Sequence, residues 1–185
     1  MKLTITKTPI ENLLILETVC FEDDRGFFLE SWNKRDLQEA GIIVEFVQDG
    51  HSGSKKNVLR GMHYQNMTSP QAKLVRCTVG KVFDVAIDLR IKSPTFGKWF
   101  GLELSSENKK LLYIPIGFAH GFAVLNDYAE IQYKQSSYYT PSAEGSVLWS
   151  DPDIGIKWPV KKPILSEKDK KAQTLKEYLK NPAFR

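Results

Sequence analysis

VFDVAIDL, residues 82–89, alternates in the manner of a β-strand. Every second residue from Phe83 onward is apolar, whereas Asp84 and Asp88 fall on the other face. This period of two predicts a strand that carries acids on one face and an apolar surface on the other.

Similar short segments occur on both sides of this strand, separated by clusters of Gly, Pro, Asn, Asp or Ser. They are Leu13–Glu17, Phe27–Trp32, Lys73–Val79, Trp99–Leu104, Leu111–Ile114, Gly121–Leu125 and Glu130–Gln135. Many short strands with turn residues between them predict a sandwich or a barrel.

Helical signals are few. Asn33–Ala40 is followed by Gly41, and glycine commonly ends a helix. Ser166–Leu179 begins with a residue type that caps helices and has Asp169 three positions later. We therefore predict a mainly β protein with a few short helices.

Length and composition indicate one domain, residues 1–185, with one main core. The chain is 42% hydrophobic and 26% charged, which is ordinary for a globular protein. No apolar run approaches the length of a membrane span, and the start has no export pattern, so we expect a cytoplasmic protein without membrane contact. Cys20 and Cys77 make no disulfide framework, and we expect both in or near the core.

The formal net charge of +4 comes from Lys and Arg residues that are scattered among acids. Such a pattern lacks the basic stripe of a nucleic-acid-binding surface, so we expect no nucleic-acid partner. A modest positive balance also suits a pocket for a phosphate-bearing small molecule, provided that arginines are placed in it.

The chain has only three histidines, at His51, His63 and His120. A metal site in a small β-barrel usually needs a closely spaced His-x-His pair, and none is present, so we expect no catalytic metal. His63 lies in Leu59–Gln65, where glycine allows close backbone approach and Arg60 offers a planar fork to anions. On spacing alone, His63 fits a functional and a structural role equally, and His120 favours a structural one.

Ordered motifs across nearly the whole chain resemble the dTDP-4-dehydrorhamnose 3,5-epimerase family. The matching stretches are Asp24–Glu30, Phe46–Asp49, Val58–Gln65, Lys73–Arg76, Phe83–Arg90, Ser93–Gly97, Gly117–Phe122 and Leu165–Asp169. So many matches in the family's order are more specific than any single motif.

The resemblance implies a cupin-type jelly-roll barrel with its core at about residues 10–150 and a C-terminal extension packed on it. It also implies a homodimer that acts on dTDP-4-keto-6-deoxyglucose without a cofactor. The family inverts C3 and C5 of this sugar, on either side of its ketone, to give dTDP-4-dehydrorhamnose. Such chemistry needs a base, an acid and a group that holds negative charge on the carbonyl oxygen.

The resemblance assigns four catalytic residues. It makes His63 the base, oriented by Asp169, and Tyr133 the proton donor. Lys73 would steady the enolate oxygen. Without the resemblance, Tyr133 reads as a cross-strand aromatic and Lys73 as a surface lysine.

The resemblance also assigns substrate contacts. Arg25 and Arg60 would hold the pyrophosphate, and Tyr139 would stack on thymine, with Tyr138 as the alternative. The remaining matched positions are Glu30, Gln48, Asp49, Gly50, His120, Glu144 and Lys168.

Three positions depart from the family pattern. Gly50 stands where the family has Asn, which would remove a side-chain contact to the nucleotide, and Ile116 replaces an acid at a turn. Met62 replaces Leu, which is conservative. None of them touches the expected base or acid.

Other functions remain open at this point. Relatives on the same scaffold epimerise only C3 or C5, and product analysis separates them. A non-catalytic sugar-nucleotide binder would not need a base, its orienter and an acid together. A metal-dependent cupin oxygenase is disfavoured by the missing His-x-His pair.

Overall fold

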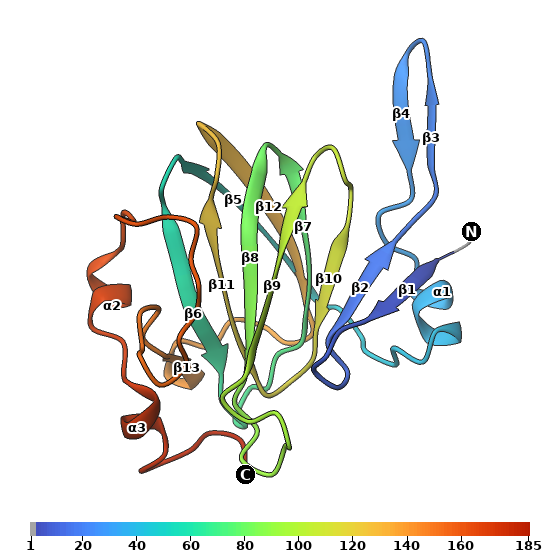
Figure 1. Ribbon diagram of the computed structural model, residues 1–185. Coiled ribbons are helices and arrows are strands. Elements are labelled where there is room, and N and C mark those ends of the chain that lie inside the picture. The colour runs from blue at the N-terminus through green and yellow to red at the C-terminus, as the bar shows by residue number, and fades with distance from the viewer. Residues whose placement is uncertain (1–2) are drawn as a thin grey trace.

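The structure, a computed structural model, describes residues 3–185, which form two antiparallel β-sheets packed face to face (Figure 1). The larger sheet has the strand order β1-β2-β10-β7-β12-β5, and the smaller has the order β13-β6-β11-β8-β9. The expected mainly β fold with a few short helices is confirmed. None of the helices in this part of the chain is long and apolar enough to cross a membrane.

The strands of the larger sheet are β1 (Thr4–Lys7), β2 (Leu14–Glu17), β5 (Gln48–Lys55), β7 (Lys73–Val79), β10 (Leu111–Ile114) and β12 (Tyr128–Gln135). Those of the smaller sheet are β6 (Leu59–Gln65), β8 (Lys81–Asp88), β9 (Trp99–Ser105), β11 (Phe118–Val124) and β13 (Glu144–Ser146). The helices are α1 (Lys34–Glu39), the 3-10 turn η1 (Pro141–Ala143), α2 (Glu167–Lys170) and α3 (Leu175–Tyr178).

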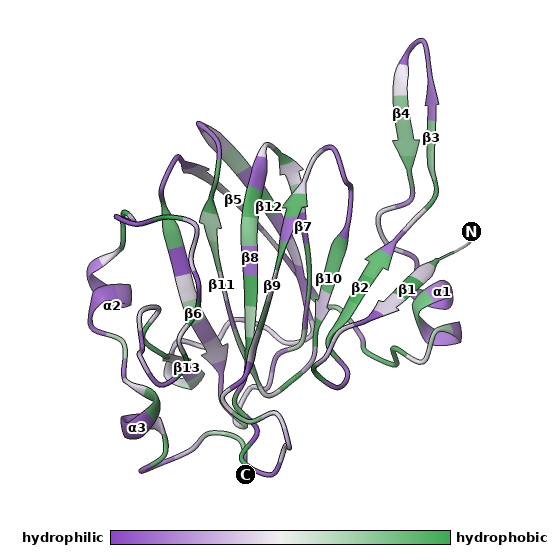
Figure 2. Ribbon diagram, in the orientation of Figure 1, coloured by the Kyte–Doolittle hydropathy of each residue, from purple (hydrophilic) through white to green (hydrophobic). Residues whose placement is uncertain are grey.

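The alternation of residues 82–89 places the two faces of β8 in different surroundings. Val82 and Ala86 pack between the two sheets, on the same face as the acids. Val85 and Ile87 pack on the opposite face, beneath the C-terminal segment. Figure 2 shows that apolar residues predominate along β8 and β2, whereas α1 and α2 are largely hydrophilic.

The C-terminal segment is fixed on the smaller sheet by Tyr178. This side chain is fully buried, and its hydroxyl donates to the Leu89 carbonyl at 2.9 Å and accepts from the Phe184 N–H at 3.2 Å. The segment was predicted as one helix over Ser166–Leu179, but that was wrong. The helix breaks because the Gln173 carbonyl accepts from Leu148 N–H at 2.8 Å, and a new helix then starts.

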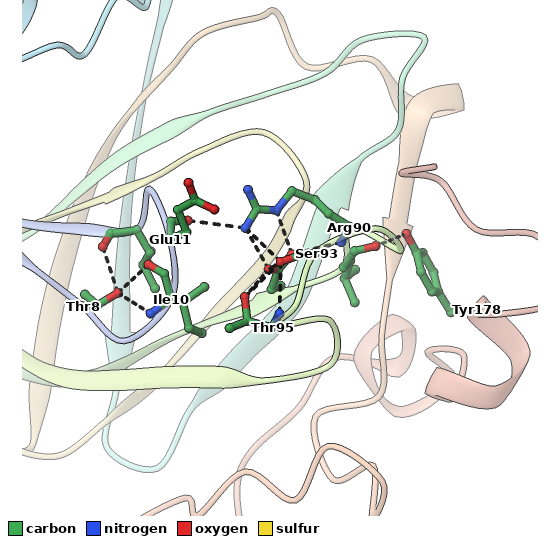
Figure 3. A network of polar contacts seen from close by, with 10 residues as sticks. Thr8, Ile10, Glu11, Arg90, Ser93, Thr95 and Tyr178 are labelled. Atoms are coloured by element: carbon green, nitrogen blue, oxygen red, sulfur yellow. Dashed lines mark hydrogen bonds and ion pairs between the residues drawn. The ribbon is translucent and has the colours of Figure 1, made fainter.

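A buried network closes the end of the smaller sheet where β8 leaves it (Figure 3). Asp88 is fully buried and accepts from Arg90 at 2.8 Å, Ser93 at 2.5 Å and Thr95 at 2.7 Å. Arg90 also donates to the Glu11 carbonyl at 3.4 Å, in the turn between β1 and β2. Burial raises the pKa of Asp88, but these hydrogen bonds outweigh it and hold the pKa below its usual value.

A two-stranded hairpin projects away from both sheets (Figure 1). It consists of β3 (Cys20–Asp23) and β4 (Gly26–Leu29), and its phenylalanines are largely exposed. The expectation that Cys20 lies in or near the core is therefore wrong, because β3 pairs with β4 alone among the described strands. Cys77 is buried, as expected.

Candidate active site

A cavity of about 510 Å³ lies between the two sheets. Strands β6 and β11 line it from the smaller sheet, and β7 and β12 line it from the larger one, with α2 at its edge. The sequence-predicted site residues that line it are Arg60, His63, Lys73, His120, Tyr133, Tyr139, Glu144, Lys168 and Asp169. The cavity therefore brings together residues that are more than 100 positions apart in the chain.

His63 and Asp169 form a hydrogen-bonded pair at this cavity. The Nε2 atom of His63 lies 2.6 Å from Oδ1 of Asp169, and the histidine side chain keeps 31% of its surface exposed. Asp169 is held by the cap of α2, because its N–H donates to Ser166 Oγ at 3.1 Å. Burial raises the pKa of Asp169, but the hydrogen bonds, that of His63 first among them, lower it further than burial raises it. An ionised carboxylate thus fixes the orientation of the imidazole.

Two glycines allow β6 and β11 to approach closely beside this pair. Gly61 has φ +140°, and a Cβ on it would meet the Cα of Gly121. A Cβ on Gly121 would lie 2.6 Å from the Arg60 carbonyl. His63 and His120 are partners in this strand pair, so both imidazoles belong to the same part of the sheet.

Asp84 supports the site from behind, although its motif alone indicated no role for it. It is fully buried, and its Oδ1 and Oδ2 atoms lie 3.0 Å and 2.9 Å from Nε2 of His120. The alternation of the strand could have indicated its burial, because Asp84 shares the face of β8 that carries Val82 and Ala86 between the sheets. A carboxylate at a core position needs a polar partner, and here that partner lines the cavity.

Lys73 supplies a cation at the start of β7. Burial lowers the pKa of its ammonium to about 8, against the opposing effects of Asp84 and Glu144, which raise it. The side chain lines the cavity, so its charge faces any ligand there. Lys73 is thus a half-buried hydrogen-bond donor of the cavity instead of the surface lysine that its spacing alone suggests.

Tyr133 reaches the cavity from the opposite sheet to His63. Its hydroxyl lies 2.5 Å from Ser52 Oγ. Burial raises the pKa of the Tyr133 phenol, and the Ser52 hydrogen bond lowers it in part. A planar ligand between the sheets would therefore meet an imidazole on one face and a phenol on the other.

The mouth of the cavity carries a cluster of polar side chains. The Tyr139 hydroxyl donates to Glu144 Oε2 at 2.7 Å, and Lys168 of α2 forms an ion pair with the same carboxylate. Arg60 donates from Nε to Ser54 Oγ at 3.0 Å. Burial raises the pKa of Glu144, but the hydrogen bonds from Lys168 and Tyr139 lower it further, so the carboxylate is ionised at neutral pH.

The remaining sequence-predicted residues do not line this cavity. Arg25 is on the projecting hairpin and Glu30 follows it, bound to Asn33 at 3.1 Å. The Asp49 carboxylate accepts from Lys134 at 2.9 Å and is exposed. The other two support cavity residues instead. They are Gln48, which accepts from Tyr139 N–H at 3.0 Å, and Gly50, which faces Tyr133. The expectation that no departure from the family pattern touches the base or the acid is therefore wrong for Gly50, because the Tyr133 ring lies over it.

Comparisons with known proteins agree on one family. The model of the dTDP-4-dehydrorhamnose 3,5-epimerase family matches residues 7–177. The chain is 56% identical to the dTDP-4-dehydrorhamnose 3,5-epimerase of Salmonella typhimurium, over 95% of this chain and 97% of that one. It is 47% identical to the Legionella pneumophila epimerase crystallised with dTDP-4-keto-L-rhamnose, with a TM-score of 0.92 and coverage of 95% and 94%. A 4-keto-6-deoxy sugar epimerase from the novobiocin cluster of Streptomyces spheroides gives a TM-score of 0.95 at 34% identity, with coverage of 100% and 93%.

Proposed function

Because this chain belongs to the dTDP-4-dehydrorhamnose 3,5-epimerase family and has that isomerase activity, we propose which of its residues carry the reaction. His63 is the base, Tyr133 is the acid, and Lys73 holds the enolate oxygen. Asp169 orients His63 and stabilises the imidazolium that forms. The substrate is a dTDP-linked 4-keto-6-deoxyhexose, inverted at C3 and C5.

Each inversion moves one proton off the sugar and another on. His63 takes the proton from the carbon next to the ketone, and the C–H electrons form the enolate, whose negative oxygen faces the Lys73 ammonium. Tyr133 then protonates the same carbon from the opposite face, and the ketone re-forms. His63 returns its proton to solvent and Tyr133 regains one, so the net change is in configuration alone.

The observation that carries this proposal is the placement of His63 and Tyr133 on facing sheets of one cavity. A base and an acid on the same side would return the proton to the face it left. Groups on opposite sides invert the centre instead. A binding module has no need for an imidazole tied to a buried carboxylate on one side and a phenol on the other.

The nucleotide end is held at the mouth of the cavity. Arg60 and Lys168 place cations there, and a guanidinium binds pyrophosphate oxygens through paired hydrogen bonds. Tyr139 offers an exposed ring on which thymine stacks. These contacts explain why a nucleotide-linked sugar, and not the free sugar, is the substrate.

The same proposal includes a homodimer in which the β3–β4 hairpin serves the cavity of a second copy of this chain. Arg25 is 90% exposed at its side chain and pairs with Asp23 on its own hairpin. Phe27 and Phe28 are 60% and 69% exposed, which is costly for a surface that nothing covers. Arg25 lies outside its own chain's cavity, so its expected contact with pyrophosphate requires the partner's cavity.

Mixing two inactive variants tests this arrangement. Arg25→Ala and His63→Ala chains are unfolded and refolded together, so that heterodimers form. If Arg25 acts across the interface, one site of the heterodimer has both groups, and activity returns to about a quarter of that of the same total wild-type protein, because about half of random pairs are mixed. Mixtures that stay inactive would show that Arg25 and His63 act in the same chain.

The experiment that tests the residue roles follows dTDP-4-keto-6-deoxyglucose in D₂O by NMR. Wild-type protein incorporates deuterium at C3 and C5 and inverts both centres. His63→Ala loses exchange at both carbons, whereas Tyr133→Phe loses inversion more than exchange. His51→Ala is the matched control, because His51 is an exposed histidine on β5 that pairs with Glu130 instead of lining the cavity.

Each outcome separates the alternatives. Exchange that persists in His63→Ala, or inversion at the wild-type rate in Tyr133→Phe, contradicts the assigned roles. Deuterium at one carbon alone identifies a single-centre epimerase. A folded wild-type protein that binds dTDP without any exchange is a sugar-nucleotide binder.

A further inference from the structure

We propose that Gly50 is a positioning residue for Tyr133: the missing side chain at position 50 lets the tyrosine ring lie across β5 so that its hydroxyl reaches Ser52. This inference rests on the proposed role of Tyr133 as the acid. It gives Gly50 a task in proton delivery, whereas its place in the sequence suggested only a lost contact to the nucleotide.

The register of β5 and β12 sets up this contact. Tyr133 and Gly50 are directly opposite each other in the antiparallel pair. Ser52 is two residues further along β5, so its side chain is on the same face as position 50. The Tyr133 hydroxyl lies 2.5 Å from Ser52 Oγ, so the ring must extend along the strand past the glycine.

A side chain at position 50 would occupy the space that the ring fills. A Cβ there would lie 2.7 Å from Cδ2 and 2.9 Å from Cε2 of Tyr133. Both atoms belong to a rigid ring, and real Cβ atoms essentially never come closer than 3.0 Å. Even alanine would therefore swing the phenol away from Ser52, because the ring cannot shorten its reach.

The position of the phenol matters for the second half of each inversion. Proton return requires the hydroxyl to face the carbon from which His63 has removed a proton. Ser52 accepts or donates a hydrogen bond at this hydroxyl, and its bond opposes the rise in the pKa of Tyr133 that burial causes. Gly50 and Ser52 thus set the direction and the acidity of the donor without contacting the sugar.

The test compares Gly50→Ala with Gly53→Ala. Gly53 is on the same strand and is covered by another tyrosine of β12, Tyr128, on the outer face. It does not line the cavity, and only its backbone carbonyl contacts a cavity residue, accepting from Arg60 at 3.4 Å. Tyr128 is 44% exposed and can swing into solvent. Both variants add one methyl group to β5, and only one of them touches Tyr133.

The readout is the ratio of completed inversion to deuterium exchange on dTDP-4-keto-6-deoxyglucose, together with the affinity for dTDP. Gly50→Ala is expected to lower inversion roughly 10- to 100-fold, since a misplacement of about 1 Å can cost on the order of 10²-fold. Exchange, dTDP affinity and the Gly53→Ala control stay at wild-type values. Adding Gly50→Ala to Tyr133→Phe causes no further loss, because the hydroxyl that it misplaces is already gone.

Ser52→Ala keeps the proposal testable if Gly50→Ala fails to fold. It adds no bulk, and it lowers inversion roughly two- to tenfold, the range that one hydrogen bond contributes. The inference is overturned if Gly50→Ala inverts the sugar at the wild-type rate, or if Ser52→Ala does so where Gly50→Ala does not fold. In that case an impaired Tyr133→Phe still leaves Tyr133 assigned as the acid. Weakened dTDP binding with unchanged turnover in Gly50→Ala also overturns the inference. A fully active Tyr133→Phe would show instead that Tyr133 is not the acid, which is the premise of the inference.

Discussion

The charge on Lys73 predicts the alkaline limb of the pH profile. Burial lowers the pKa of this ammonium to about 8, in spite of Asp84 and Glu144, which raise it. Only the protonated form stabilises the enolate oxygen. The alkaline limb therefore has its midpoint near pH 8, and activity is lost as the pH rises through that value.

The size of the effect follows from the titration. With a pKa near 8, roughly nine-tenths of the molecules carry the ammonium at pH 7 and roughly one-tenth at pH 9. The value of kcat/KM, which reports the pKa values of the free enzyme, thus falls about tenfold between these two pH values. The Tyr133 phenol titrates at higher pH, because burial raises its pKa above the usual value near 10, so it does not set this limb.

Two substitutions move the limb in opposite directions. Asp84→Asn removes the carboxylate that is the larger of the two groups raising the pKa of Lys73, so the limb moves to lower pH. Lys73→Arg keeps its charge at every accessible pH, so the alkaline limb moves to higher pH, toward the pH at which the Tyr133 phenol titrates. The maximal rate of this variant falls, because the guanidinium has a different geometry from the ammonium. The assay is kcat/KM from pH 6 to 10, corrected for non-enzymatic exchange. The reasoning is refuted if the limb stays at the same pH in both variants.

Three further substitutions separate catalysis from stability. Asp169→Asn should slow deuterium exchange by about 10²–10⁴-fold, the usual contribution of a positioned base, because His63 loses its carboxylate, while dTDP affinity measured by calorimetry stays unchanged. Asp88→Asn should lower the free energy of unfolding at pH 7 by about 1–3 kcal/mol, less than for a fully buried pair because the Arg90 partner is partly exposed. The pKa of Asp88 is lower in the folded state than in the unfolded state. The stability that its ionised carboxylate contributes is therefore fully present above the unfolded-state pKa and is lost as the pH falls through the folded-state pKa. The free energies of unfolding of wild type and variant should accordingly converge at acid pH. Tyr178→Phe should cost about 1–3 kcal/mol in thermal unfolding, with the ratio of inversion to exchange intact.

Strands with a regular apolar pattern could be predicted from the sequence. Lys73–Val79 and Leu111–Ile114 were predicted with the bounds of β7 and β10. Their residues pack in the apolar core and end at turn residues, so burial and pattern agree. The N-terminus of α2 was also predicted, because Ser166 caps it as the sequence indicates.

Strand β5 could not be predicted because its inward positions, which lie behind the cavity residues of β12, are polar or glycine. Its inward positions are Gln48, Gly50, Ser52 and Ser54, which give no apolar alternation. Their pairing partner β12 supplies the bulk that they lack. Residues that shape a polar cavity break the pattern by which core strands are recognised.

The spacing of residues in the sequence also did not predict which of them come together in the cavity. His63 and Asp169 are 106 positions apart, and only the family resemblance linked them. Asp84 and Ser52 bind side chains of the site, and the resemblance gave neither of them a role. Such supporting residues follow from strand register, which a single sequence does not specify.

The two faces of β8 explain why the C-terminal segment belongs to the site. The inward face carries Asp84, whose burial costs stability unless it is paired, and its partner is His120, which lines the cavity. The outward face, with Val85 and Ile87, would be exposed if the C-terminal segment did not cover it. The same packing holds α2 against β6 and places Asp169 beside His63. Apolar burial on one side of the smaller sheet therefore supplies the carboxylate that the base needs on the other.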